Sequence, residues 1–253
     1  MRFHRRAAPR DSSTKLGSMA YTPHIIPVES LRLLVFDLDG TLIDSRRDLA
    51  NSVNAMLSHL GRPELPQDVI ASYIGDGAGM LVRRALGDPE DEGYVVGALT
   101  FFLEYYREHK LDYTQLYPGV IESLERLRRG PDGIIRQMAV LTNKPIGPST
   151  AICDALGLSR YFFRIYGGNS FSTKKPDPQG LNALLREAGA GPFETLMIGD
   201  SDIDILTARS SGVWSLGCRF GLSPHTLDAA QPDCLVDSAF DWAEALDAAR
   251  IER

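Results

Sequence analysis

The stretch "LLVFDLDGTLIDS", from Leu33 to Ser45, decides the fold. Its first four residues are apolar, and a continuous apolar run is typical of a strand buried on both faces of a parallel sheet. Asp37 follows the run directly, and Asp39 comes two positions later in "DGT", which favours a turn. The pattern predicts a buried strand over residues 31–36 whose carboxyl end carries two carboxylates.

The whole chain has the composition of an ordinary soluble protein. It has 253 residues, 43% of them hydrophobic and 24% charged, with a formal net charge of −6. This length suits one large or two modest domains. The acidic balance argues against a nucleic-acid partner or a membrane-surface role, and no apolar run approaches the ~20 residues that cross a bilayer. The three cysteines (Cys153, Cys218 and Cys234) are scattered, which favours a reducing, cytoplasmic compartment over disulfides or a zinc site.

The first 18 residues differ from the rest in charge. They carry five basic residues (Arg2, Arg5, Arg6, Arg10 and Lys15) against one acidic residue, Asp11. The segment lacks the apolar stretch of a secretory signal. We interpret residues 1–30 as a disordered basic leader, with Met19 as a possible working start. An organelle transit peptide is the alternative interpretation.

The rest of the chain alternates between apolar runs and amphipathic stretches. Further strands are predicted over residues 137–142, 195–198, 213–216 and 234–236. Helices are predicted over residues 119–129, 149–156, 178–188, 202–211 and 240–249. The alternation predicts an α/β fold with a Rossmann-like parallel sheet and helices on both faces.

One region breaks this alternation. Residues 46–115 contain helical patterns and no predicted strand, with two short helices around "GDG" over 69–74 and 78–86. Apolar side chains recur at helical spacing in two longer helices: Leu49, Val53, Met56, Leu57 and Leu60, then Val95, Leu99, Phe102 and Tyr106. We therefore expect a helical cap domain at 46–115, inserted into a core formed by 31–45 and 116–253.

Polar side chains follow three of the predicted strands. Asp37 and Asp39 follow the first, Thr142 and Asn143 the second, and Asp200 the third. One aspartate after a strand is usually a turn or cap residue, but the carboxyl ends of parallel strands meet at one edge, where ligands bind. Clustered carboxylates repel one another and need a cation, and oxygen ligands favour Mg²⁺.

Four motifs, in this order, resemble those of the haloacid dehalogenase superfamily of phosphatases. They are "DLDGTL" at 37–42, "VLTNKP" at 140–145, "KKPDP" at 174–178 and "GDSDID" at 199–204. The resemblance covers about residues 31–237. It implies a Mg²⁺-dependent phosphomonoester hydrolase that works through an aspartyl-phosphate, with a small phosphorylated metabolite as its partner.

The resemblance also implies catalytic roles for motif residues. Asp37 would attack the phosphorus, and Asp39 would protonate the leaving alcohol and later take a proton from water. Thr142 and Lys175 would contact the phosphoryl group, although a helix-capping role for the Thr142 hydroxyl fits its position equally well. The Mg²⁺ ligands would be the Asp37 and Asp200 side chains and the Asp39 backbone carbonyl.

Supporting roles are implied for neighbouring residues. Asp204 is expected to orient Lys175 or a metal-bound water. Asn143 is a candidate substrate-binding residue, and Lys144 has only a supporting position. Lys174 is expected to be solvated, and Asp202 is expected to be a helix-start carboxylate.

The segment "SYIGDGAGMLVRRALG", at 72–87, resembles the cap of phosphoglycolate phosphatases. Gly75 and Gly77 permit a tight turn, and a helix starting near Ala78 would aim N–H groups at an anion. We therefore predict that both glycines bind substrate and that 2-phosphoglycolate is the ester. An ordinary joint between helices is the alternative, and Asp76 is expected to face solvent or pair with a base.

Other functions fit the same core motifs. A phosphatase for a nucleotide, a sugar phosphate or pyrophosphate would keep all four, and a sugar phosphomutase would keep Asp37 and Asp39. A carbon–halogen hydrolase needs neither the second aspartate nor Mg²⁺, and a non-catalytic binding protein would be expected to lose a carboxylate. A cap disfavours large substrates. A monomer and a homodimer both fit the sequence.

Overall fold

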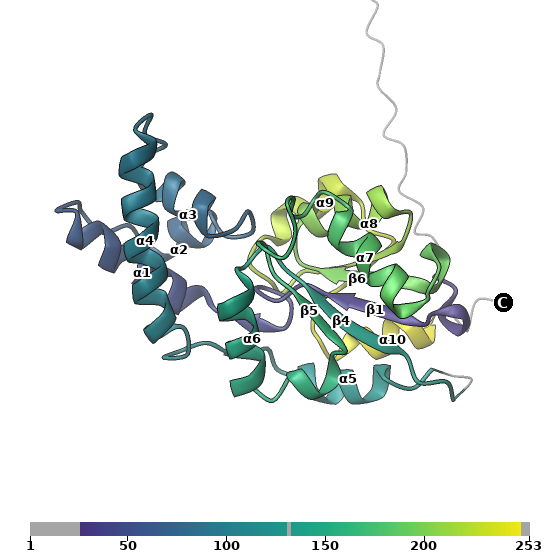
Figure 1. Ribbon diagram of the computed structural model, residues 1–253. Helices are drawn as coiled ribbons and strands as arrows, with labels where there is room; N and C mark the ends of the chain where they lie inside the picture. The colour runs from purple at the N-terminus through teal and green to yellow at the C-terminus, as the bar shows by residue number, and fades with distance from the viewer. Residues whose placement is uncertain (1–25, 131–132, 249–253) are drawn as a thin grey trace, which may run out of the picture.

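The structure, a computed structural model, describes residues 26–130 and 133–248 (Figure 1). Residues 1–25 of the predicted leader therefore lie outside the described residues. Residues 26–30, assigned to the same leader, instead pack on the core. Ile26 and Val28 are buried, and a short 3-10 helix spans Val28–Ser30. The buried Arg136 side chain donates a hydrogen bond of 2.8 Å to the Val28 carbonyl, which anchors this segment.

A six-stranded parallel sheet forms the centre of the core, in the order β5-β4-β1-β6-β7-β8. The strands are β1 (Leu33–Phe36), β4 (Gln137–Leu141), β5 (Arg164–Tyr166), β6 (Thr195–Gly199), β7 (Trp214–Cys218) and β8 (Cys234–Val236). β1 lies between β4 and β6, so the three strands that end in motif residues are neighbours. β5 was not among the predicted strands, because it has only three residues and an exposed to half-buried pattern at the sheet edge.

Helices cover both faces of this sheet, as the alternation predicts (Figure 1). They are α5 (Val120–Leu127), α6 (Ile146–Ala155), α7 (Gln179–Ala188), α8 (Asp202–Ser211), α9 (Leu227–Ala230) and α10 (Asp241–Ala248). Leu34 and Phe36 of β1 belong to the apolar cluster with α5, α6 and α10. Leu33 and Val35 belong to the opposite cluster, with α7 and α8. The alternating side chains of one strand thus bury both faces, which explains its continuous apolar run.

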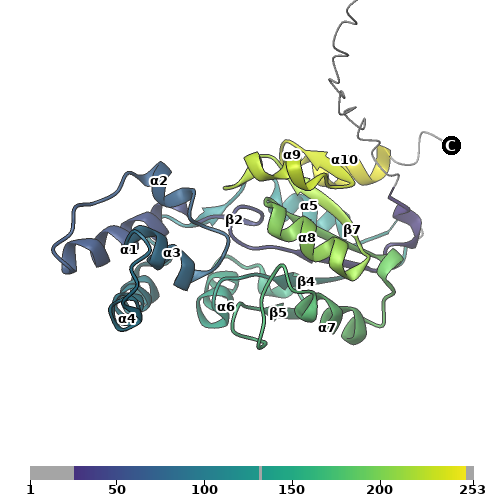
Figure 2. The ribbon, with the colours of Figure 1, turned by 90° about the horizontal axis from the view of Figure 1, so that it is seen from above.

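Four helices between residues 46 and 109 form the cap. They are α1 (Arg46–His59), α2 (Gln67–Ala71), α3 (Ala78–Ala85) and α4 (Glu92–His109). They enclose an apolar core of their own and lie beside one end of the sheet (Figure 2). Two short antiparallel strands, β2 (Ile43–Asp44) and β3 (Gln115–Leu116), join the cap to the core. The chain therefore enters and leaves the cap at adjacent points.

Two further observations bear on the environment of the protein. None of the helices in the described ranges is both long enough and apolar enough to span a membrane. All three cysteines are free thiols; Cys153 and Cys218 are buried, and Cys234 is partly buried.

Candidate active site

The turn after β1 separates the two carboxylates of the opening stretch. The Gly40 amide donates a hydrogen bond to the Ile43 carbonyl at 2.9 Å, and Leu42 donates to Leu38 at 3.0 Å. Gly40 has a φ of +87°, which residues with a side chain rarely adopt. A Cβ at Gly40 would also lie 2.2 Å from Asp200 Oδ2. Both the backbone conformation and the lack of space therefore require glycine at this position. Asp37 therefore stays at the strand end while Asp39 is carried around the turn.

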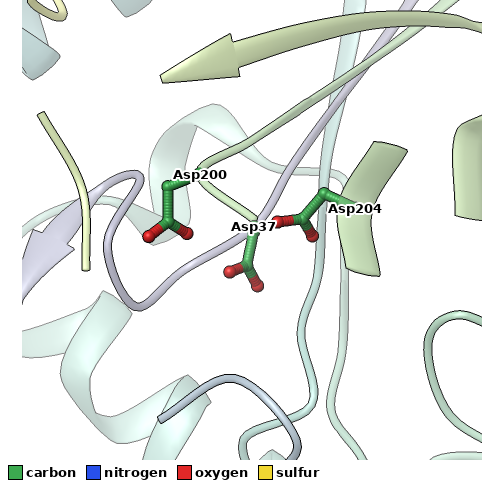
Figure 3. Close-up of side chains that lie close together, drawn as sticks. All are labelled: Asp37, Asp200 and Asp204. Carbon is green, nitrogen blue, oxygen red and sulfur yellow. The ribbon is translucent and has the colours of Figure 1, made fainter. Parts of the chain in front are cut away.

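Three buried aspartates converge at the carboxyl ends of β1 and β6 (Figure 3). One oxygen from each of Asp37, Asp200 and Asp204 lies within 4.8 Å of the others. Burial raises the pKa of Asp37 to about 6, an effect that Lys175 opposes and Asp204 reinforces. Burial, followed by repulsion from Asp204 and Asp37, raises the pKa of Asp200 well above its usual value. The cluster therefore favours the binding of positive charge.

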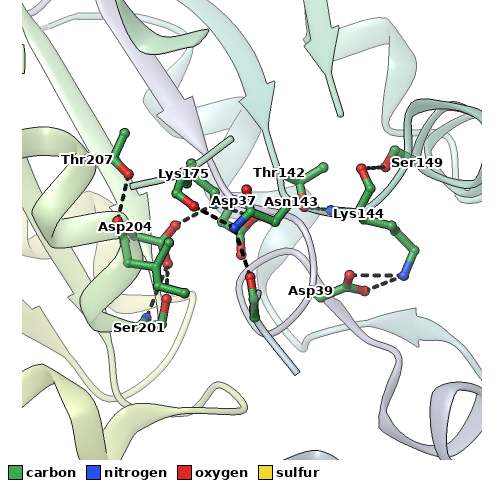
Figure 4. Close-up of polar contacts among 12 residues, drawn as sticks. Asp37, Asp39, Thr142, Asn143, Lys144, Ser149, Lys175, Ser201, Asp204 and Thr207 are labelled. Atoms are coloured by element: carbon green, nitrogen blue, oxygen red, sulfur yellow. Dashed lines mark hydrogen bonds and ion pairs between the residues drawn. The ribbon is translucent and has the colours of Figure 1, made fainter. Parts of the chain in front are cut away.

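Lys175 supplies part of that charge (Figure 4). Its Nζ lies 2.7 Å from Asp37 Oδ1 and 2.6 Å from Asp204 Oδ1. Burial lowers the pKa of Lys175, but the two carboxylates outweigh burial and raise it overall, so the side chain stays protonated. The second oxygen of Asp204 accepts hydrogen bonds from the Ser201 amide at 3.2 Å and the Ser201 hydroxyl at 2.8 Å. Asp204 therefore contacts Lys175 through one oxygen and Ser201 through the other.

Asp200 has one oxygen to spare. Its Oδ2 accepts hydrogen bonds from the Leu222 amide at 2.6 Å and the Ser223 amide at 3.1 Å. Within the described part of the chain, neither Oδ1 of Asp200 nor Oδ2 of Asp37 accepts a hydrogen bond. A Cβ at Gly221 would lie 2.2 Å from the Asp200 Cβ, so the carboxylate sits in a close-fitting cradle. Two fixed, buried carboxylates with spare oxygens suit a hard cation such as Mg²⁺.

Asp39 is held by a different set of groups. Lys144 Nζ lies 2.9 Å from both Asp39 carboxylate oxygens, and the Ser45 hydroxyl donates to Oδ1 at 2.5 Å. Figure 4 shows this pair on the side of Asp37 away from Asp204. Burial lowers the pKa of Lys144, but Asp39 outweighs it and the pKa rises overall. Sequence reasoning gave Lys144 no more than a supporting position, because the contact joins residues 105 positions apart.

Thr142 and Asn143 lie at the end of β4, as predicted. The Thr142 oxygen accepts a hydrogen bond from the Lys144 amide at 3.2 Å, so it stabilises the turn before α6 and keeps its own hydrogen free to donate. Asn143 Nδ2 donates to the carbonyls of Gly75 and Lys175, each at 3.0 Å. Asn143 therefore connects the cap to the lysine loop.

The glycine loop of the cap contacts the core through its carbonyl groups. Besides the Gly75 carbonyl, the Asp76 carbonyl accepts a hydrogen bond from Lys174, a side chain expected to be solvated. The expectation for the Asp76 side chain is confirmed, since it pairs with Arg84 at 2.5 Å. A Cβ at Gly77 would lie 2.9 Å from the Asn143 carbonyl oxygen. The glycines thus allow close approach of the cap to the core.

A pocket lies between the cap and the core. Its core side includes Asp37, Asp39, Thr142, Asn143, Lys144, Lys175 and Asp200, and its cap side includes Ile74, Gly75, Gly77, Leu81, Phe102, Leu103 and Tyr106. All the predicted site residues line this pocket except Asp204, which contacts Lys175 but does not line the pocket. Sequence reasoning placed Tyr106 only in the apolar stripe of a cap helix and did not identify it as a pocket residue.

The arrangement is able to support nucleophilic attack by a carboxylate on an anionic ester. Asp37 faces a pocket with a buried ammonium group at 2.7 Å, and a second carboxylate, Asp39, lines the same pocket. When all four carboxyl groups at the site are ionised, they exceed the two ammonium groups by two negative charges, which a divalent cation would neutralise.

Comparison with known proteins places similar sequences in one family of hydrolases. Residues 34–218 match the family described as haloacid dehalogenase-like hydrolase. A phosphoglycolate phosphatase of Pseudomonas putida is 39% identical over 216 residues, covering 81% of this chain and 76% of the relative. A phosphoglycolate phosphatase of Neisseria meningitidis is 37% identical, covering 83% of this chain and 92% of the relative.

Solved structures show the same architecture. A protein of Haemophilus somnus, described as a "predicted phosphoglycolate phosphatase", superposes with a TM-score of 0.78 at 32% identity, covering 85% of this chain and 97% of that one. A protein of Lactobacillus delbrueckii with a similar description gives a TM-score of 0.77 at 27% identity, covering 85% of this chain and 98% of that one.

Proposed function

Because the chain belongs to the haloacid dehalogenase-like hydrolase family, we propose that it is a phosphatase that hydrolyses 2-phosphoglycolate to glycolate and phosphate. The observation that carries the proposal is the buried Asp37 carboxylate, held 2.7 Å from Lys175 in the pocket beneath the cap. The names of the relatives at 37–39% identity support this choice of ester.

The first step in this proposal transfers the phosphoryl group to the protein. A carboxylate oxygen of Asp37 attacks the phosphorus, and the bond between phosphorus and the glycolate oxygen breaks. Protonated Asp39 donates its proton to the departing oxygen. Thr142 donates its hydroxyl hydrogen to a phosphoryl oxygen, and Lys175 balances the negative charge.

The second step releases phosphate. A water molecule attacks the aspartyl-phosphate and gives a proton to Asp39, and the bond between phosphorus and Asp37 breaks. Phosphate leaves and both carboxyl groups return to their starting states. For both proton transfers, the Asp39 carboxyl group has to exchange its contacts with Lys144 and Ser45 for contacts in the pocket.

Mg²⁺ is the proposed cofactor. The residues that would hold it are Asp37 and Asp200 through their spare side-chain oxygens, and Asp39 through its backbone carbonyl. When bound, the ion supplies positive charge to the phosphoryl oxygens. Asp204 remains outside this set, because Ser201 and Lys175 already use both of its oxygens.

A screen of small phosphate esters with Mg²⁺ tests the proposal. We expect kcat/KM for 2-phosphoglycolate to exceed the values for sugar phosphates, nucleotides and pyrophosphate. A higher value for several of those compounds would reject the ester and retain the phosphatase. Formation of a bis-phosphate intermediate from a sugar phosphate would indicate a mutase instead.

Three related points are part of the proposal. The cap domain spans residues 46–115 within a core of 31–45 and 116–253. The protein acts in the cytoplasm, a compartment supported by its free thiols. It acts on a small metabolite as a monomer or homodimer, without nucleic-acid or membrane partners. Sedimentation analysis distinguishes the two oligomeric states.

A further inference from the structure

Tyr106 is an unusual residue in the cap. Among the described cap residues that line the pocket, Tyr106 is the only one whose side chain has a polar atom. Its side chain is 2% exposed, and the ammonium group of Lys144 lies beside its hydroxyl. Lys144 can only donate, and no acceptor among the described residues takes the hydrogen of the Tyr106 hydroxyl. A buried O–H without an acceptor costs stability, which indicates a ligand or a water molecule as its missing acceptor.

Lys144 lies next to this hydroxyl group from the opposite side of the pocket. Its Nζ is 4.7 Å from the centre of the Tyr106 ring, and both residues line the pocket. An ammonium group has three N–H donors, and Asp39 presents only two acceptor oxygens to it. A hydroxyl donor from the cap and an ammonium group from the core thus lie together in the pocket that Asp37 also lines.

We propose that Tyr106 and Lys144 bind the carboxylate of the substrate, so that the enzyme selects short phosphate esters with a second anionic group. This inference rests on the proposed function and specifies its substrate class. With the phosphate at Asp37 and Lys175, the far end of a two-carbon ester extends toward Asp39 and Lys144. Among the described cap residues that line the pocket, no other side chain carries a hydrogen-bond donor.

The glycine loop is a weaker candidate for this role. The loop directs two acceptors, the carbonyl groups of Gly75 and Asp76, toward donors of the core, Asn143 and Lys174, and it contributes no charged donor to the pocket. The pocket also contains several carboxylates, which repel a second anion unless a cation stands beside it. Lys144 is the buried ammonium group on the side away from Lys175 (Figure 4).

The test compares two esters and two matched tyrosine variants. Ethyl phosphate has the same number of carbons as 2-phosphoglycolate but no carboxylate. Tyr106→Phe removes only the hydroxyl group. We expect it to lower kcat/KM for 2-phosphoglycolate by about 10-fold or more, through KM, since a hydrogen bond to a charged group is lost. The value for ethyl phosphate should change by less than about 2-fold.

Tyr105→Phe is the control variant. Tyr105 lies on the same helix but stacks between Phe101 and His109, outside the pocket. It should leave both esters unchanged. Equal losses on both esters with Tyr106→Phe, or no loss on either, would overturn the carboxylate site. A larger loss on sugar phosphates than on 2-phosphoglycolate would also overturn it.

Binding provides a second measurement that does not depend on turnover. Calorimetry with Mg²⁺ would compare 3-phosphonopropionate, which carries a carboxylate, with propylphosphonate, which does not. We expect Tyr106→Phe to weaken only the first compound, by about 10-fold or more. Lys144→Gln should weaken the first compound more than the second, because it also removes the charge that balances Asp39. Equal affinity of the wild-type protein for both compounds would reject the site.

The two proposals fail in different ways. If no phosphate ester is hydrolysed, the proposed function fails, and the binding comparison alone decides the site. If another carboxylated ester is preferred and is equally sensitive to Tyr106→Phe, the identity of the ester fails and the site stands.

Discussion

Asp37 and Asp39 are two positions apart but are held by different ammonium groups. Lys175 contacts Asp37 at 2.7 Å, and Lys144 contacts both oxygens of Asp39 at 2.9 Å. The turn at Gly40 makes this separation possible, since it directs the second carboxylate away from the strand end. One short stretch of sequence can therefore supply both a nucleophile and a separate acid–base group.

Asp37→Asn is expected to abolish turnover without unfolding the protein. An amide is a poor nucleophile and a weaker ligand for a hard cation. Activity against 2-phosphoglycolate and the melting temperature are the measurements. Asp202→Asn is the control, because Asp202 lies in the first turn of α8 outside the acid cluster. Retention of about a tenth of wild-type kcat, with deamidation excluded, would contradict the role of Asp37.

Asp39→Asn is expected to slow both phosphorylation and dephosphorylation. A positioned general acid–base group contributes about 10²–10⁴ to the rate. Rapid-quench measurements with p-nitrophenyl phosphate should show phosphorylation rescued more than dephosphorylation, because a good leaving group needs no proton. Equal rescue of the two steps would argue against one carboxylate serving in both.

Among the structural elements, the glycine loop before α3 makes contacts that the sequence pattern did not predict. The pattern "GDGAG" predicted a tight turn followed by a helix, and α3 does begin at Ala78. The loop carbonyls, however, contact Asn143 and Lys174 of the core. Those contacts join segments 68 and 98 residues apart, and no local pattern contains them.

Gly77→Ala is therefore expected to lower kcat/KM for every ester, whether or not it has a carboxylate. The new Cβ would lie 2.9 Å from the Asn143 carbonyl oxygen, and the φ of +87° adds backbone strain. The steady-state kinetics of 2-phosphoglycolate and ethyl phosphate provide the measurement. A loss confined to 2-phosphoglycolate would mean that the loop binds the carboxylate directly.

Gly79→Ala is the matched control for this change. Gly79 lies two positions later, in the first turn of α3, with open space where its Cβ would be. The substitution should leave kinetics unchanged and stabilise the helix by about 0.5–1 kcal/mol.

The elements themselves were largely predictable, for a physical reason. β1, β4 and β6 are buried on both faces, so their apolar runs are continuous and easy to recognise. β2 and β3 have two residues each, too few for any periodicity, and they were missed. Asp37, Thr142 and Asp200 were predictable because each follows a buried strand, whereas Lys175 lies in a loop and was assigned only through the family resemblance. The pairing of Lys144 with Asp39 and the position of Tyr106 depend on tertiary packing and were not.

On the scale of the whole molecule, the site combines burial with unbalanced negative charge. Burial raises the pKa values of Asp37, to about 6, and of Asp200. Below those pKa values the carboxyl groups hold protons, which a divalent cation must displace because only the ionised form is a ligand. Mg²⁺ affinity should therefore fall as the pH falls through about 6 and rise above it.

Calorimetric titration with Mg²⁺ at about pH 5 and about pH 7.5 tests this dependence. The melting temperature should also rise with Mg²⁺ more strongly at the higher pH, because the ion binds only the folded site. Asp200→Asn should remove most of the response at both values. An affinity that is the same at both pH values would contradict the predicted competition between protons and the ion.

The antiparallel pairing of β2 and β3 has a consequence for protein engineering. Ile43 lies opposite Leu116 and Asp44 opposite Gln115, so about seventy residues leave the core and return to it through neighbouring positions. Replacing them by a short turn would require little rearrangement of the flanking strands, and the entropy of closing a loop changes only slowly with its length. Because the cap helices have their own apolar core, we expect them to fold as an exchangeable module. Grafting the corresponding segment of another family member between Ser45 and Gln115 is expected to change which alcohol is accepted, while the hydrogen bond from Ser45 to Asp39 in the phosphoryl-transfer site is kept.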